Sequence, residues 1–183
     1  MKQILLIVFG IICLVAILVV ALPRMRRFFP GWKGKLIESW ETSNTPIRVR
    51  IDVREVKHGG LTPGANYVFQ SAAYGSEQWT EIMTFRHDDQ VEIPRDKVHI
   101  ISEKFGYVYM GWKYAVTTDG GASWSVWDAE MDLPGWKCCN YRRIRDVRIA
   151  INGTGAMTLN SIPGRAGEVP ELHTKDYGKH WEL

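Results

Sequence analysis

Apolar and polar residues alternate along much of this chain, but near its beginning residues 4–22 form one continuous apolar run. Residues 4–22 contain no charged side chain and are numerous enough for a helix to cross the hydrocarbon core of a bilayer. Residues 48–54 alternate strictly between charged and apolar positions, which is the pattern of a half-buried β-strand. Short runs of β-branched and aromatic residues, separated by glycine-containing turns, predict further strands at 98–101, 107–110, 113–116, 147–151, 156–159 and 169–173.

These patterns divide the chain into four segments. We expect a short tail at 1–3, a transmembrane helix at 4–22, a linker at 23–40 and a β domain at 41–183. The linker carries the basic and aromatic residues that suit a membrane interface. A cleaved signal peptide is the alternative, but its apolar region normally covers about 7–15 residues, so an uncleaved anchor fits better.

Two matching octapeptides each follow a predicted strand. Thr117–Trp124 and Thr174–Trp181 both fit the pattern Ser/Thr-x-Asp-x-Gly-x-x-Trp. An Asp at a turn can accept hydrogen bonds from the backbone N–H groups ahead of it, and a Gly supplies the positive φ that a tight hairpin needs. The Trp then buries a large apolar face over the turn. We therefore assign structural roles to Thr117, Asp119, Gly121, Trp124, Thr174, Asp176, Gly178 and Trp181.

The octapeptide pattern resembles the Asp-box, the hairpin turn that recurs once per blade in BNR-type β-propellers. The two Trp residues are 57 positions apart, near the repeat expected of one blade. Residues 71–79 resemble a third, degraded copy that lacks the Asp and has one extra residue before its Trp. The resemblance implies an all-β, antiparallel domain of two or three blade-like units, whereas a closed propeller has four or more. We expect a sandwich-like body, an open wedge of blades, or a ring closed by a homo-oligomer.

Enzymes that carry this motif have active sites that this chain does not reproduce. The resemblance to sialidases implies three Arg residues that clamp a carboxylate and a Tyr nucleophile, and glycosidases in general need a pair of carboxylates. We find no recognisable counterpart of either set, and Asp119 and Asp176 are assigned to their turns. The chain also contains no phosphate loop, nucleophile elbow or zinc motif. We expect no catalysis, no metal and no cofactor.

Charge and cysteine content narrow the function further. The formal net charge is +3, but Lys2, Arg24, Arg26 and Arg27 flank the apolar run, and the rest of the chain has one more acidic than basic residue. Nucleic-acid binding therefore has no electrostatic support. Cys13 lies in the apolar run, and the neighbours Cys138 and Cys139 form no disulfide framework, because a bond between adjacent residues is strained. Whether these two have a role stays open.

The orientation of the β domain has arguments on both sides. The basic residues after the apolar run favour a cytoplasmic domain, whereas the short Met-Lys tail favours an export-type signal anchor. The Asp-box resemblance also implies an extracytoplasmic domain. We expect a single-pass protein of a bacterial inner membrane whose domain is exported.

Aromatic residues outside the octapeptides are candidates for contact with a partner. We select Trp136, in the Pro-Gly loop at 133–137, together with Trp112 and Tyr109. The expected function is a non-catalytic, membrane-anchored module that binds other proteins, as an accessory or assembly subunit of integral membrane subunits. The alternatives are a membrane-tethered immunity-type protein that neutralises a toxin and a carbohydrate-binding module.

Overall fold

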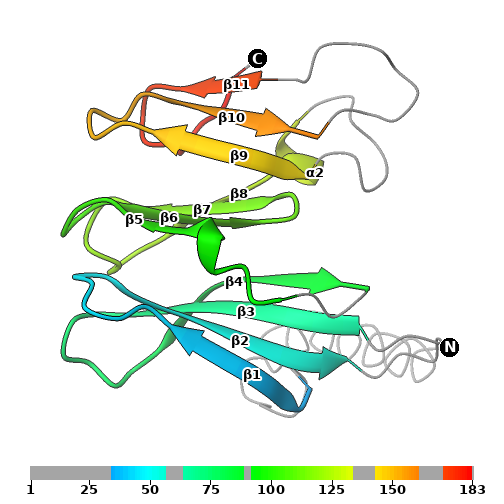
Figure 1. Ribbon diagram of the computed structural model, residues 1–183. Coiled ribbons are helices and arrows are strands. Elements are labelled where there is room, and N and C mark those ends of the chain that lie inside the picture. The colour runs from blue at the N-terminus through cyan, green and yellow to red at the C-terminus, as the bar shows by residue number, and fades with distance from the viewer. Residues whose placement is uncertain (1–33, 57–63, 89–91, 134–142, 161–170, 183) are drawn as a thin grey trace, which may run out of the picture. The chain divides into compact units, whose positions relative to one another are not determined.

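The computed structural model describes residues 34–56, 64–88, 92–133, 143–160 and 171–182. Almost all of them belong to one compact unit, Leu36–Leu183. They form antiparallel sheets with hardly any helix, which confirms the predicted all-β class (Figure 1). No helix in this part of the chain is long and apolar enough to cross a membrane, and the helix predicted at 4–22 lies outside the described residues.

Sheet 1 contains four strands in the order of the sequence, β1 (Leu36–Glu41), β2 (Arg48–Val56), β3 (Gly64–Ala72) and β4 (Thr80–His87). The alternating run at 48–54 is therefore the second strand of its sheet and not the first. β1 begins inside the segment that the sequence assigns to a linker. Its pattern does not reveal it, because it is an edge strand with five of its six residues exposed.

Sheets 2 and 3 follow along the chain. Sheet 2 begins after the short helix η3 (Arg95–Lys97) and is followed by the helical turn α2 (Ala129–Asp132). Its strands are β5 (Val98–Ile100), β6 (Gly106–Met110), β7 (Lys113–Thr117) and β8 (Ser125–Asp128). Sheet 3 contains β9 (Ile144–Ile149), β10 (Gly155–Leu159) and β11 (Glu171–Thr174), and an isolated bridge joins His173 to Glu182.

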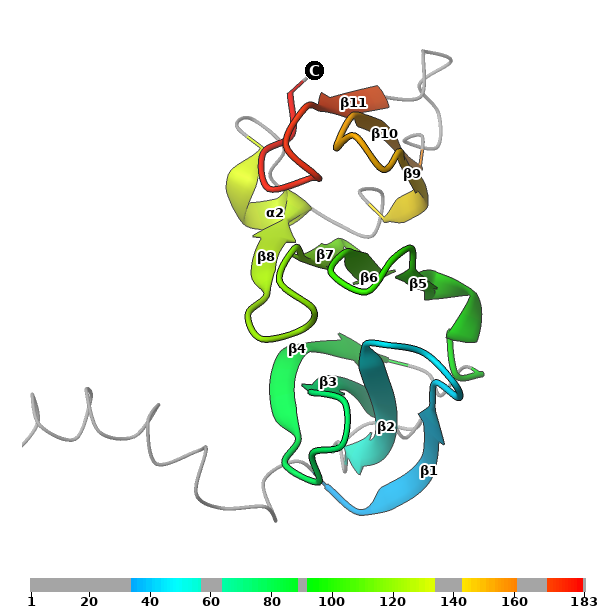
Figure 2. The same cartoon turned by 90° about the vertical axis from the view of Figure 1, so that its left-hand side faces the viewer.

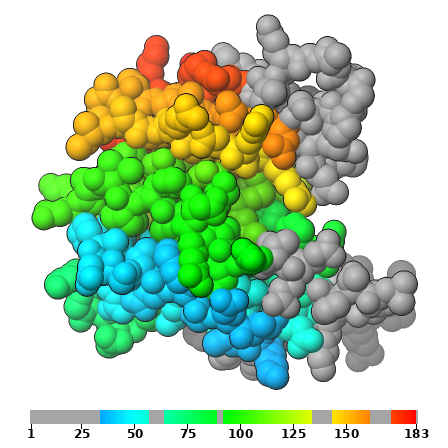
Figure 3. Space-filling model, in the orientation of Figure 1, coloured from blue at the N-terminus to red at the C-terminus, as the bar shows by residue number. Residues whose placement is uncertain are grey.

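Sheet 2 lies between the other two sheets and buries both of its faces. All five residues of β6 are buried. Tyr107 and Tyr109 belong to the apolar core shared with sheet 3, whereas Val108 and Met110 belong to the core shared with sheet 1. Figure 3 shows β5 and η3, in green, between the blue residues of sheet 1 and the yellow residues of sheet 3. The three open sheets are therefore layers around two separate cores.

The two ends of this stack differ in which connections they carry. The turns β1–β2, β3–β4, β5–β6, β7–β8 and β9–β10 all lie at one end, at the left of Figure 1 and towards the viewer in Figure 2. We call this the turn end. At the opposite end β1 begins at Leu36, β6 turns into β7, and β9 begins. We call it the entry end, because the chain enters sheet 1 there.

Candidate functional site

The first octapeptide turn joins β7 to β8 and is closed by its own side chains. The Thr117 hydroxyl accepts hydrogen bonds from the N–H groups of Gly121 at 2.9 Å and Asp119 at 3.4 Å, and it donates to Asp119 Oδ1 at 2.8 Å. The Asp119 carboxylate accepts from the Ser123 N–H at 2.9 Å and from the Ser123 hydroxyl. The bonds of Thr117 are protected from water, since this residue is buried.

The second octapeptide turn follows β11 and repeats these bonds. The Thr174 hydroxyl accepts from the N–H groups of Gly178 at 2.9 Å and Asp176 at 3.3 Å, and it donates to Asp176 Oδ1 at 2.9 Å. The Asp176 carboxylate accepts from the His180 N–H at 3.0 Å and contacts the His180 ring through Oδ2. Among the side chains that make these bonds, only the one at the seventh position differs in kind: it is Ser123 in the first turn and His180 in the second.

Both turns place two consecutive residues in the left-handed region. Gly121 and Gly178 have φ values of 88° and 83°, and the preceding residues, Gly120 and Tyr177, have φ values of 76° and 67°. This conformation is strained for Tyr177, which carries a Cβ. Its backbone is held on both sides, because its N–H donates to the Gly153 carbonyl at 2.9 Å and its carbonyl accepts from the Tyr114 hydroxyl at 3.0 Å.

The turn carboxylates stay ionised. Hydrogen bonds from the Ser123 hydroxyl and N–H lower the pKa of Asp119 to about 2. Burial by itself raises the pKa of Asp176. Hydrogen bonds from His180 and Thr174 outweigh this, so the pKa of Asp176 lies below its ordinary value. Both groups therefore act as hydrogen-bond acceptors inside their turns, and neither holds a proton that it could donate at neutral pH.

Trp124 connects the first turn, which belongs to sheet 2, to the neighbouring sheet 1. Its indole N–H donates to the Ser71 hydroxyl at 2.9 Å, and Ser71 lies at the end of β3 with 2% exposure. A Cβ at Gly121 would lie 3.1 Å from a methyl group of Ile47, so the missing side chain lets the turn approach sheet 1 closely. The Trp124 ring is half-buried against the core between sheets 1 and 2.

Trp181 joins the second turn to sheet 2 through apolar contact. Its ring is 8% exposed and meets the Tyr114 ring edge-on, with centroids 5.5 Å apart and planes at 90°. A Cβ at Gly178 would lie 2.5 Å from the Tyr114 hydroxyl oxygen and 2.9 Å from the Trp181 ring. The Trp181 indole N–H is buried and has no hydrogen-bond partner among the described residues. Each octapeptide thus fastens its sheet to the sheet before it.

The segment between β3 and β4, which resembles a third copy, keeps only part of this arrangement. Gly75 is left-handed with φ of 78°, but the hydroxyl of Ser71, at the position that Thr117 and Thr174 take in the octapeptides, accepts a hydrogen bond from Trp124 of sheet 2. Trp79 lies over its own sheet, beneath the guanidinium groups of Arg48 and Arg50 at 4.9 and 4.3 Å from the ring centroid.

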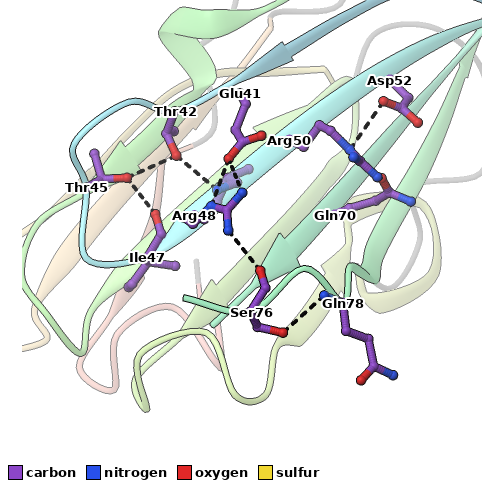
Figure 4. A network of polar contacts seen from close by, with 11 residues as sticks. Glu41, Thr42, Thr45, Ile47, Arg48, Arg50, Asp52, Gln70, Ser76 and Gln78 are labelled. Atoms are coloured by element: carbon purple, nitrogen blue, oxygen red, sulfur yellow. Dashed lines mark hydrogen bonds and ion pairs between the residues drawn. The ribbon is translucent and has the colours of Figure 1, made fainter. Parts of the chain in front are cut away.

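Those arginines belong to a polar network on the outer face of sheet 1 (Figure 4). Arg48 pairs with Glu41 at 2.7 Å and donates to the Ser76 carbonyl at 2.8 Å. Arg50 donates to the Gln70 side-chain oxygen at 2.7 Å and lies 3.5 Å from Asp52, which is 4% exposed. The outer face of sheet 1 is therefore internally paired and polar, unlike its apolar inner face.

The structure changes the set of candidate contact residues. Tyr109 is 2% exposed and belongs to the core between sheets 2 and 3, so it offers no ring surface to a partner. Trp112 is partly buried and packs against both cores. Trp136 lies outside the described residues, as do Cys13, Cys138 and Cys139. Within the described residues, no group of His, Cys, Asp and Glu side chains could hold a metal ion.

A hollow of about 760 Å³ runs along β9 beside sheet 2. Its lining includes His99, Tyr107, Asp146, Arg148 and His173. The His99 ring stacks on Tyr107 with centroids 4.7 Å apart, and its Nε2 is buried without a partner among the described residues. Burial lowers the pKa of His99 and raises the pKa of Tyr107 to about 12. Asp146 is the one carboxylate among the described lining residues, so they contain no glycosidase pair.

Comparison with known proteins finds a partial similarity to a curated protein. This chain is 28% identical over 130 residues to a "probable oligoxyloglucan-reducing end-specific xyloglucanase" from Neosartorya fischeri. The match covers 67% of this chain but spans only 13% of the length of the xyloglucanase. No protein-family model matches the chain, and no solved structure matches it.

Proposed function

We propose that the three sheets are blade-like units of the Asp-box type, arranged as an open stack. The repeated turn bonds of Thr117 and Thr174 support this assignment, since both turns hold their sheets to the preceding one. The polar outer face of sheet 1 supports an open stack over a ring, because the end unit of a repeat array needs a polar outer face.

We propose that this stack is a non-catalytic, membrane-anchored module that binds a protein partner at its turn end. The observation that carries the proposal is a set of exposed apolar side chains, one on a turn of each sheet. Tyr74 is 83% exposed on the β3–β4 turn, Ile101 is 43% exposed on the β5–β6 turn, and Ile151 is 71% exposed on the β9–β10 turn. A contiguous patch of exposed apolar side chains is typical of an interaction surface, and we propose that these three turns present such a patch.

Purification from native membranes tests this proposal. The full chain should co-purify with an integral membrane protein in fixed stoichiometry, and the double variant Tyr74→Ser, Ile151→Ser should lose that protein. Met131→Ser is the matched control, because Met131 is 82% exposed but lies on α2, away from the turn end. Equal loss in both variants would contradict the assigned surface. Recovery of a soluble toxin as the partner would favour the immunity-type alternative.

Carbohydrate binding is the second candidate, and the xyloglucanase relative favours it. The hollow along β9 offers the mixture of aromatic and polar side chains that sugar sites use, with His99, Tyr107 and Arg148 in its lining. Titration of the full chain with xyloglucan oligosaccharides distinguishes the two functions. Saturable binding that Arg148→Gln weakens would support this candidate, whereas no heat change at millimolar oligosaccharide would eliminate it.

A further inference from the structure

The three sheets converge on a hollow of about 400 Å³ at the entry end. Sheet 1 contributes the end of β4, sheet 2 contributes η3 and the end of β6, and sheet 3 contributes the start of β9 and Asn160 after β10. One backbone bond ties sheet 3 to sheet 2 in this place, and a second extends the pairing of β9 with β10 inside sheet 3. The Ile144 N–H donates to the Gly111 carbonyl at 2.6 Å, and the Asn160 N–H donates to the Arg143 carbonyl at 2.8 Å.

The charged side chains that line this hollow are all basic. They are Lys97, Arg143 and Arg145, and none of the described lining residues is acidic. Asp96 pairs with Lys97 Nζ at 3.0 Å, but its own side chain is 73% exposed. Lys97 is also held over Tyr109, with Nζ 3.5 Å from the hydroxyl and 5.0 Å from the ring centroid. Burial favours neutral Lys97, yet the bonds to Asp96 and Tyr109 raise its pKa, so it stays a cation.

Arg143 supplies a hydrogen-bond donor that the described part of the fold leaves unused. Its Nε is buried and has no partner among the described residues. A buried donor is normally paired, so an unpaired one that lines a hollow indicates a missing acceptor. Arg145 is two residues further along the chain and exposed, and a guanidinium group of this kind can approach a bound anion through two parallel N–H bonds.

We propose that this hollow binds a phosphate group. Arg143 and Arg145 donate to the phosphate oxygens, and Lys97 supplies a third positive charge from the opposite sheet. Arginine is suited to this role, because its planar fork of donors matches the geometry of phosphate oxygens. This proposal is argued from the side chains that line the hollow and does not depend on the partner proposed for the turn end.

The position of the hollow suggests an anionic lipid as the source of the phosphate, and this step rests on the proposed membrane anchor. The hollow and Leu36 lie at the same end of the stack. Residues 23–35 between the expected anchor and β1 can extend over at most about 45 Å. A linker of this length is long enough for the entry end to reach the phosphate layer of the bilayer.

The test uses the full chain in a nonionic detergent and has two arms. In the first, phosphatidic acid is added to the micelles, with diacylglycerol as the control that lacks only the phosphate, and retained lipid is counted by native mass spectrometry. In the second, inorganic phosphate is titrated by calorimetry against chloride at equal ionic strength. The variants are Arg145→Gln and Lys97→Gln, with Lys97→Arg as the conservative replacement. Lys104→Gln is the matched control, because this exposed cation lies between β5 and β6 at the turn end, outside the hollow.

We expect wild type to bind at least one of the two phosphates. Arg145→Gln should weaken binding about tenfold while Lys104→Gln leaves it unchanged, since a charge-assisted bond is lost only in the first. Retention of phosphatidic acid alone identifies the lipid as the source, and binding of inorganic phosphate identifies a soluble compound. Absence of binding to both phosphates, or equal weakening by Arg145→Gln and Lys104→Gln, overturns the proposal. Unchanged thermal unfolding of Arg145→Gln, whose side chain is exposed, separates loss of binding from loss of fold.

Discussion

The two octapeptide turns make the same bonds inside the turn but join their sheets to the preceding one in different ways. Trp124 is half-buried and reaches sheet 1 through a hydrogen bond to Ser71. Trp181 is buried, meets Tyr114 edge-on, and leaves its indole N–H without a partner among the described residues. The local turn therefore follows from the local sequence, whereas the preceding sheet decides how the Trp stabilises the stack.

The largest expected effect separates the two Trp residues directly. Trp181→Ala should lower the free energy of unfolding by about 4 kcal/mol, because it removes a buried ring from a packed core. Trp124→Ala should cost clearly less, since its ring is half-buried. Urea unfolding of both variants, followed by circular dichroism, checks the order. Equal costs would show that the two junctions do not differ as described.

The glycines of the turns give a second contrast. Gly178→Ala should cost about 3 kcal/mol, because a left-handed Cβ there would overlap the Tyr114 hydroxyl at 2.5 Å. Gly75→Ala is the matched control, with the same sign of φ and no atom within 4 Å of the added Cβ. It should cost only the backbone strain of about 1 kcal/mol. A similar loss in both variants, measured by the same urea titration, would mean that the close approach to Tyr114 is unimportant.

These contrasts also show how far the sequence predicts the structure. The turns were predictable because Thr, Asp and Gly close a hairpin within eight residues. The burial of Tyr109 was not, because β6 is apolar at every position and shows no alternation when both faces of a sheet are covered. The basic hollow was missed for a related reason. Lys97 and Arg143 are distant in sequence, and only the packing of three sheets brings them together.

A smaller effect is expected from the hydrogen bond between Trp124 and Ser71. A double-mutant cycle with Trp124→Phe and Ser71→Ala should give a coupling energy of about 1 kcal/mol, the usual contribution of one such bond. Trp181→Phe should lose no hydrogen-bond energy, because the indole N–H that it removes has no partner in the described structure. Zero coupling in the cycle would rule out the bond as the link between sheets 1 and 2.

The smallest expected effect is on the stability of the protein at low pH. The pKa of Asp119 is about 2 in the folded protein, below its ordinary value of 3.8. Its contribution to stability is therefore present above the ordinary pKa and is lost as the pH falls from about 4 towards 2. Wild type should be more stable than Asp119→Asn at pH 6, and the difference should shrink by pH 2. A difference that is independent of pH would contradict the role of the ionised carboxylate.

Hydrogen exchange in Trp181→Ala tests most directly whether each octapeptide fastens its sheet to the preceding one. Peptide-resolved exchange, read by mass spectrometry under native conditions, reports the local stability of each sheet. We predict faster exchange in β9, β10 and β11, with β2 and β3 of sheet 1 as protected as in wild type. Uniform loss of protection over all three sheets, or unchanged protection in sheet 3, would contradict the account.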